Sequence, residues 1–172
     1  IIDFYILDYC KKHNLILPTR NKEAEDAESF EGALVLEPKK GLHENVVVGD
    51  LKSLYPSIIV SANMSPETIK RREEMTGIAD HNMDYIKLGN GVQFYQFPKG
   101  IFPIILDELF TMRQEAKKQF KETKDPKYDQ KQKATKILMN SFYGVLGHPG
   151  FRLYRREIAD SVTWFGRQVI TW

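Results

Sequence analysis

The spacing of apolar residues predicts long helices in the second part of the chain. From Ile104 to Lys124, apolar residues recur every three or four positions, and the stretch contains neither glycine nor proline. This spacing predicts an amphipathic helix, which we expect to end at Asp125-Pro126. A second helix is predicted from Tyr128 to Tyr143 and a third from Glu157 to Trp172. The first two, joined by a short polar turn, predict an antiparallel helical hairpin.

Shorter apolar runs precede these helices. Residues 1–17 show helical spacing, whereas the β-branched run Val46–Val48 predicts a buried strand that ends beside Asp50. Partial alternation over Val92–Phe97 predicts another strand. Two further segments are a candidate strand beginning at Val35 and Leu36, and an expected polar loop from Thr19 to Ser29. Strands followed by long helices indicate an α+β fold.

The composition narrows the class of protein. The chain has 172 residues, of which 42% are hydrophobic and 12% aromatic, enough for one domain with a real core. No apolar run approaches the length that spans a bilayer, and the first residues lack the features of a signal peptide. Cys10 is the single cysteine, and the four histidines are scattered, so neither an internal disulfide nor a zinc site is expected. These features predict a soluble intracellular protein.

Charge is unevenly distributed although the net charge is only +2. The region between Glu23 and Glu31 holds five acidic residues and no basic one, while Thr111 to Lys136 holds nine basic residues against four acidic ones. A local basic stretch suggests an anionic partner held at one place. A solvated helix face is the commoner explanation of such a run, and charge alone does not decide between them.

Two helical stripes sharpen the anion interpretation. On a helical wheel, the basic stripe of the first helix comprises Arg113, Lys117, Lys121 and Lys124. A polar stripe of the second helix comprises Lys136, Asn140 and Tyr143. Cations that face each other from two helices form a pocket suited to a multiply charged anion such as a triphosphate. Ordinary surface lysine is the alternative, and it is the preferred interpretation of Lys121 and Lys124.

The residues after the Val46–Val48 run are candidates for metal and phosphate binding. Asp50 would offer a hard-cation ligand, because Mg²⁺ prefers rigid oxygen ligands. The backbone that turns at Ser53 and Leu54 would offer N–H groups to phosphate oxygens, and Tyr55 would supply a flat wall. A single aspartate after an apolar run is common, so this signal is weak by itself.

The longer strings are far more specific. Residues 50–59, Asp-Leu-Lys-Ser-Leu-Tyr-Pro-Ser-Ile-Ile, closely resemble the first palm motif of family B DNA polymerases, D-x-x-S-L-Y-P-S-I-I. Residues 136–144, Lys-Ile-Leu-Met-Asn-Ser-Phe-Tyr-Gly, resemble that family's fingers motif, K-x-x-x-N-S-x-Y-G. Residues 63–68 and 100–103 fit the same family, and Glu31-Gly32 and Glu37-Pro38 are similar to archaeal members. The resemblance extends from about Glu31 to Trp172.

The resemblance implies a role for each matched residue. Asp50 would bridge two catalytic Mg²⁺ ions, and the backbone carbonyl of Leu51 would complete one metal site. Backbone N–H groups of Ser53 and Leu54 would bind the β- and γ-phosphates of a dNTP, and Tyr55 would exclude a 2′-hydroxyl. Six further residues would face the nucleotide: Arg113, Lys117, Lys136 and Asn140 at the triphosphate, and Tyr143 and Gly144 at the nascent base pair.

The resemblance also implies an architecture and partners. It predicts an α+β fold with part of a polymerase palm sheet and a two-helix antiparallel fingers hairpin. The expected divisions are an N-terminal helix and loop near the palm (1–30), a palm part (31–103), the fingers (104–147) and a return to the palm (148–172). The expected partners are primer–template DNA, dNTP and the remaining polymerase segments, and a sliding clamp is a further candidate. We expect no membrane association. The expected location is the cytoplasm, at the nucleoid of a prokaryote, or the nucleus if the source is a eukaryote.

The sequence departs from the family pattern in one respect that bears on activity. The family's third motif, Asp-Thr-Asp-Ser, supplies a second metal-binding carboxylate, and it is not found in the chain. Asp160-Ser161 is only superficially similar, lies in a helical pattern, and is interpreted as structural. The exonuclease and thumb domains are not found either. We therefore expect a piece of a larger or split polymerase, inactive alone.

Two other functions remain open at this stage. The main alternative is a non-catalytic nucleic-acid-binding or scaffold subunit that keeps the palm–fingers shape. The presence of Asp50, Tyr55, Lys136 and Asn140 favours the catalytic interpretation. A general NTP-binding module is disfavoured, because the sequence has no glycine-rich P-loop.

Overall fold

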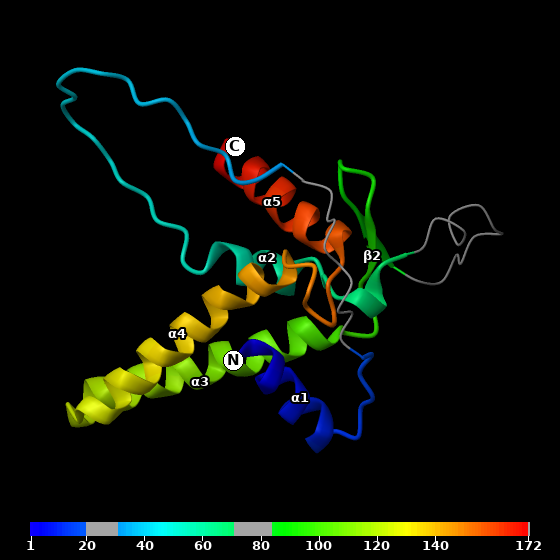
Figure 1. The fold of residues 1–172 in the computed structure, drawn as a ribbon. Helices are drawn as coiled ribbons and strands as arrows, with labels where there is room; N and C mark the ends of the chain where they lie inside the picture. Colours follow the sequence, from blue (N-terminus) through cyan, green and yellow to red (C-terminus); the bar gives the residue numbers. More distant parts are fainter. Residues whose placement is uncertain (20–30, 71–83, 172) are drawn as a thin grey trace.

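Two long antiparallel helices, α3 (Ile101–Thr123) and α4 (Pro126–Leu146), form the largest unit of the computed structural model (Figure 1). The structure describes residues 1–19, 31–70 and 84–171. In these ranges it contains five α-helices and a two-stranded antiparallel sheet, so the predicted α+β class is confirmed. The predicted helical hairpin is confirmed as well, with helix ends that differ by one to three residues.

The turn of the hairpin follows from its sequence. Lys124 ends α3 in the left-handed conformation, with φ of 57°. Asp125 then caps α4 by accepting a hydrogen bond from the Lys127 backbone nitrogen at 3.0 Å. Pro126 occupies the first helical position, where its missing N–H is not needed. Helix α3 begins at Ile101, two residues before Pro103. Pro103 is compatible with this start, because a proline is tolerated in the first turn of a helix.

The predicted apolar stripe of α3 forms its buried face. Ile105, Leu109 and Ala116 are at most 1% exposed, and Met139 and Phe142 of α4 are completely buried. The rings of Phe102 and Phe142 make an edge-to-face contact with centroids 5.6 Å apart. Burial of large side chains on both helices fixes how the two helices face each other.

Three shorter helices pack around this hairpin. The N-terminal helix α1 (Ile2–Lys12), predicted from its spacing, buries Ile2, Ile6 and Cys10 on one face. Helix α5 (Arg156–Thr171) matches the third predicted helix, apart from Trp172, which lies outside the described residues. Helix α2 (Leu54–Ser61) was not predicted. Pro56 obscured it in the sequence, yet it stands in the first turn, where proline is tolerated.

An ion pair connects α1 with the chain that leads into α5. The Arg152 guanidinium donates to both carboxylate oxygens of Asp3, with Nε–Oδ1 2.6 Å and Nη2–Oδ2 3.0 Å. A third nitrogen of the same group donates to the backbone carbonyl of Pro18 at 3.2 Å. The hydrogen bond with Asp3 raises the pKa of Arg152 above its ordinary value. This bidentate pair joins residues from opposite ends of the sequence.

The sheet is small. Strand β1 (Tyr85–Lys87) pairs with β2 (Gln93–Tyr95), with Ile86 opposite Phe94, and a 3₁₀ turn (Pro66–Thr68) precedes them. The strand predicted over Val92–Phe97 is therefore confirmed but shorter, and β1 was missed.

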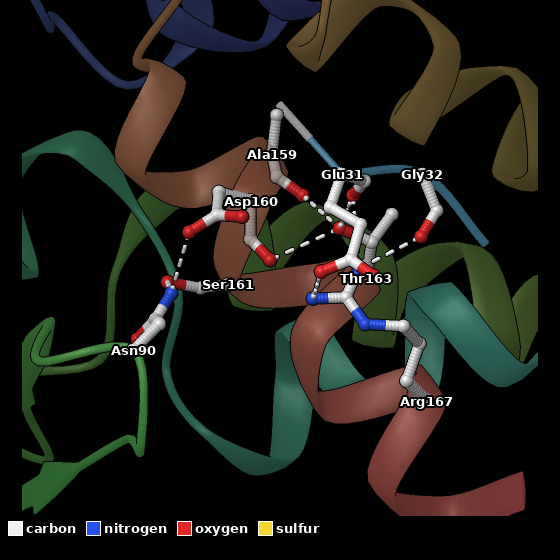
Figure 2. A network of polar contacts seen from close by, with 8 residues as sticks. All are labelled: Glu31, Gly32, Asn90, Ala159, Asp160, Ser161, Thr163 and Arg167. Carbon is white, nitrogen blue, oxygen red and sulfur yellow. Dashed lines mark hydrogen bonds and ion pairs between the residues drawn. The ribbon is translucent and has the colours of Figure 1, made fainter. Parts of the chain in front are cut away.

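Polar side chains of α5 hold both the β1–β2 hairpin and the chain at residue 31 (Figure 2). Asn90 donates to Asp160 Oδ2 at 2.9 Å and to Ser161 Oγ at 3.2 Å. On the next turns, Thr163 donates to the Glu31 backbone carbonyl at 3.0 Å, and Arg167 donates to the Gly32 carbonyl at 2.7 Å. Asp160 and Ser161 thus lie within a helix, as predicted, and they anchor the turn between the strands.

The two strands predicted near residues 35 and 46–48 are wrong. Residues 31–53 contain no regular secondary structure, and Figure 1 shows them as a long loop that runs past α5, extends away from the helices and returns to α2. Val46, Val47 and Val48 are 65%, 92% and 88% exposed. A β-branched run favours a strand only where a neighbouring strand supplies hydrogen bonds, and among the described residues no strand lies against it. The loop predicted over residues 19–29 lies, apart from Thr19, outside the described ranges.

Within the described residues, the helices are all too short or too polar to cross a lipid bilayer.

Candidate functional site

A cleft of about 500 Å³ opens between the beginning of α2 and the helices α3 and α4. Three separate segments line it: residues 50–56, Arg113 with Lys117, and Lys136 with Asn140. Nine residues singled out from the sequence are among them: Asp50, Leu51, Ser53, Leu54, Tyr55, Arg113, Lys117, Lys136 and Asn140. The fold therefore brings the two sequence motifs to one cavity.

Among the described residues, Asp50 is the only acidic one that lines the cleft. It is exposed and stands at the end of the irregular segment 31–53 instead of at the end of a buried strand. Asp50 thus lines the cleft, whereas the buried strand that was predicted to carry it is absent from the described residues.

The beginning of α2 lines the cleft. Ser53 precedes the helix in the left-handed conformation, with φ of 52° and ψ of 45°, and its side chain does not cap the helix. Its Oγ instead accepts a long hydrogen bond, 3.5 Å, from Nη1 of Arg113. The first N–H groups of an α-helix have no partner inside the helix, and the helix dipole is positive at this end. Both features favour an anion at Ser53 and Leu54.

Four cationic side chains converge on the same space. Arg113 and Lys117 stand one turn apart on α3, Lys136 projects from α4, and Lys52 lies beside Asp50. The positive charge of Arg113 lowers the pKa of Lys117 below its ordinary value. Burial and the charges of Lys52 and Lys136 lower this pKa further, each by less. Mutual repulsion of this kind is relieved when an anion binds between the cations.

Arg113 carries a second sign of an unfilled interaction. Its Nε is buried, and among the described residues it has no hydrogen-bond partner. A buried donor without an acceptor is unfavourable. Because this atom belongs to a guanidinium that lines the cleft, an oxygen-rich ligand there would satisfy part of the same group.

An aromatic pair borders the cleft. The rings of Tyr55 and Tyr143 have centroids 4.5 Å apart and an interplanar angle of 52°. Burial raises the pKa of Tyr143, and the nearby Tyr55 and Asp160 raise it further. The adjacent Gly144 has open space where a side chain would begin, with no atom within 4 Å. Tyr143 and Gly144 do not line the cleft directly, and Tyr143 is connected to it through Tyr55.

Sequence reasoning missed Lys52. It occupies a variable position of the first motif, so no role followed from the resemblance, yet it lines the cleft next to Asp50. Its position one residue from a candidate metal ligand was the available signal. In contrast, Lys121 and Lys124 are exposed and do not line the cleft, in line with the preferred interpretation as surface lysines.

Other acidic residues do not add to the site. Asp107, in the first turns of α3, forms an exposed ion pair with Lys99. In the parts of the chain that the structure describes, no three His, Cys, Asp or Glu residues are grouped as a metal site. Asp50 is thus the one carboxylate that these residues bring to the cleft.

An acid, a helix N-terminus and four cations surround one cleft. Comparison with known proteins identifies the family. The family model for DNA polymerase family B matches residues 1–172. The chain belongs to this family, as its motifs suggested.

Individual relatives agree with this assignment. The chain is 39% identical over 177 residues to a DNA polymerase of Desulfurococcus sp. (strain Tok), and 38% identical over 177 residues to that of Thermococcus gorgonarius. Each alignment covers 99% of this chain and 22% of the relative. The structure of the family B DNA polymerase from the hyperthermophilic archaeon Pyrobaculum calidifontis superposes with a TM-score of 0.80 at 32% identity, covering 99% of this chain and 22% of that one. The chain thus spans about a fifth of the length of these relatives.

Proposed function

We propose that the cleft is the nucleotide-binding part of a DNA polymerase active site. The complete enzyme would transfer a nucleotidyl group from a dNTP to the 3′-hydroxyl of a primer paired with template DNA. The observation that carries this proposal is the meeting of Asp50, the α2 N-terminus and four cations in one cavity. Membership of the polymerase family supports the same substrate class.

The proposed architecture follows the family resemblance. Residues 104–147, which include most of α3 and all of α4, would be the fingers. Residues 31–103 would form part of the palm, residues 148–172 would return to it, and residues 1–30 would lie next to it. In support, α2 and the α3–α4 hairpin meet at the cleft from separate sides.

Each nucleotide-site residue predicted from the sequence has a proposed task in holding the nucleotide. The N–H groups of Ser53 and Leu54 would bind the β- and γ-phosphates, and Arg113, Lys117 and Lys136 would neutralise the triphosphate while Asn140 donates a further hydrogen bond. Tyr55 would lie under the sugar, and Tyr143 and Gly144 would lie against the new base pair. Several distributed cations suit a triphosphate better than they suit a single carboxylate.

The cleft also fits a divalent metal. Asp50 offers an exposed carboxylate, and Leu51, which also lines the cleft, offers a backbone carbonyl. Oxygen ligands of this kind hold Mg²⁺, which keeps several water molecules and binds substrate phosphates. Two bound Mg²⁺ ions would supply electrostatic stabilisation of the attacking and leaving oxygens.

The protein's own contribution is positioning and charge. The cations of α3 and α4 would hold the β- and γ-phosphates, so that the α-phosphorus faces the primer hydroxyl. The bond from the α-phosphorus to the bridging oxygen would break, and the same cations would stabilise the departing pyrophosphate. The polar cleft would thus be complementary to charge that increases on the leaving group.

We also propose that these 172 residues do not extend a primer alone, because the described residues bring a single carboxylate to the cleft. The exonuclease domain, the third palm motif, the thumb and a sliding clamp remain predicted partners. The test is a primer-extension assay with Mg²⁺ and all four dNTPs. Robust incorporation by the isolated chain would contradict the proposal.

The catalytic role is tested in the full-length polymerase with Asp50→Asn. We expect turnover to fall by at least ~10³-fold while binding of primer–template DNA persists, since the metal rather than the duplex depends on this carboxylate. Asp107→Asn, which removes an acid outside the cleft, is the matched control. DNA binding without extension by the unmodified full-length protein would favour the non-catalytic alternative.

The sugar role is tested with Tyr55→Ala. Removing the ring should admit ribonucleotides, so the ratio of kcat/KM for dNTP over rNTP should fall by about 10²-fold or more. Unchanged discrimination would show that Tyr55 is not the sugar wall.

A further inference from the structure

A glycine in α5, Gly166, packs against the ring of Tyr55. Gly166 is buried, and its backbone conformation is one that any residue can adopt. Glycine in a helix interior is less favourable than alanine, because it loses more backbone entropy on folding. A buried helical glycine without a conformational reason suggests that a side chain would not fit.

The surroundings of Gly166 supply that reason. A Cβ atom at this position would lie 3.1 Å from Cε1 and 3.8 Å from Cδ1 of Tyr55. Its distance to Cδ1 of Ile58 would be 3.8 Å, an ordinary contact. The crowding therefore falls on the tyrosine ring alone, and α5 approaches it by backbone instead of by side chain.

The Tyr55 ring is in contact with two neighbours and belongs to a residue that lines the cleft. Gly166 lies against the ring, and the ring of Tyr143 has its centroid 4.5 Å away. An added methyl group at residue 166 would push the ring by a few tenths of an ångström toward the space proposed for the sugar. Helix α5 would thus set the depth of that part of the cleft, although it contributes no residue to the lining.

We infer that Gly166 is a positioning residue for sugar selection, because its missing side chain sets how far the Tyr55 ring extends into the nucleotide site. The inference rests on the proposed function and adds a determinant that no cleft-lining residue supplies. Gly144 shows that the feature is specific. It is also a helical glycine, yet a Cβ there would meet nothing within 4 Å.

The experiment uses the full-length polymerase with Gly166→Ala. A ring displaced into the sugar site should raise KM for dNTP by about 5-fold with little change in kcat, and should lower kcat/KM for rNTP further, so that discrimination increases. The matched control is Gln168→Ala, an exposed change on the same helix, which should leave both nucleotides unaffected. Thermal unfolding of each variant reports stability separately.

A double-mutant cycle identifies the contact. In the Tyr55→Ala background the ring is absent, so Gly166→Ala should no longer alter KM or discrimination. A merely structural effect of the substitution would persist in that background. If Gly166→Ala prevents folding by itself, recovery of folding in the Tyr55→Ala background supports the inference, and failure in both backgrounds overturns it.

The outcomes separate the inference from the proposed function. If Tyr55→Ala alters sugar discrimination but Gly166→Ala behaves like Gln168→Ala, the inference is overturned and the proposed function stands. If Tyr55→Ala leaves discrimination unchanged, the sugar-wall role fails, and the inference fails with it.

Discussion

The two sides of the cleft are built differently. The cations Arg113, Lys117 and Lys136 project from α3 and α4, whose inner faces are completely buried at positions such as Leu109 and Met139. Asp50 stands at the end of residues 31–53, which have no regular secondary structure and expose three consecutive valines. Regular helices fix the spacing of the positive charges, whereas nothing comparable fixes the carboxylate within the described residues. The positive side of the site is thus preorganised by local structure, and the acidic side depends on further contacts.

The largest expected effect concerns stability. Leu109→Ala should lower the free energy of unfolding by about 3 kcal/mol, because it leaves a cavity in a closed interface. Val47→Ala in the exposed segment should change it by less than about 0.5 kcal/mol. Denaturant unfolding of the 172-residue chain measures both.

The same pair of variants in the full-length polymerase sharpens the comparison. If a neighbouring strand covers the valines there, Val47→Ala should become costly only in that longer protein. A cost above about 1 kcal/mol in the 172-residue chain would contradict the description of this segment as unsupported.

Removal of a preorganised cation should have the next largest effect. In the full-length polymerase, Lys136→Ala should lower kcat/KM for dNTP by about 10²-fold, because a charge held near the phosphates is lost. Lys121→Ala removes an exposed lysine of the hairpin that does not line the cleft, and should change kcat/KM less than about 2-fold. Equal effects of the two substitutions would mean that the hairpin acts by general charge and not through the cleft.

A cation on the irregular side should contribute less. Lys52→Ala should lower kcat/KM for dNTP by about 5-fold, and the effect should weaken with added salt, since this exposed lysine is not held by a helix. A loss as large as that of Lys136→Ala would show that the Asp50 segment is ordered as firmly as the helices once the nucleotide is bound.

The smallest expected effect is the uptake of protons by Lys117 when the nucleotide binds. Neighbouring cations lower the pKa of Lys117 below its ordinary value. In the protein without nucleotide, the Lys117 ammonium therefore loses its proton at a lower pH than an ordinary lysine does. A bound triphosphate would raise that pKa, so binding should take up protons at alkaline pH, and affinity should fall as pH rises through the pKa of the free site.

Calorimetric titration in buffers of different ionisation enthalpy measures this uptake. Lys117→Arg keeps the charge at every accessible pH, so the corresponding uptake should disappear. The same uptake in both proteins would assign it to another group.

The helices of the second part of the chain were predictable because their signals are local. Apolar spacing identified α3, α4 and α5, and Asp125-Pro126 identified the turn. The first part was less predictable, because the fate of Val46–Val48 depends on whether another strand is available. The same residues that favour a strand remain exposed when no partner lies beside them.

The candidate site followed from the sequence more fully than the first part of the fold did. Two motifs specified seven of the cleft residues, since a motif encodes chemistry irrespective of the element that carries it, and the basic stripe of the first predicted helix supplied Arg113 and Lys117. Lys52 was missed because it stands at a variable motif position. Gly166 was invisible for another reason: its importance lies in a neighbour more than a hundred positions away, and one-dimensional spacing does not record such proximity.

The bidentate pair between Asp3 and Arg152 has a practical consequence for anyone who wishes to trim this polypeptide. The Arg152 side chain is only 15% exposed. Deletion of α1 would remove Asp3 and leave the Arg152 guanidinium without its counter-charge in a poorly hydrated position. A shortened version intended to isolate the α3–α4 hairpin should therefore retain residues 2–12, or replace Arg152 by a neutral side chain of similar length.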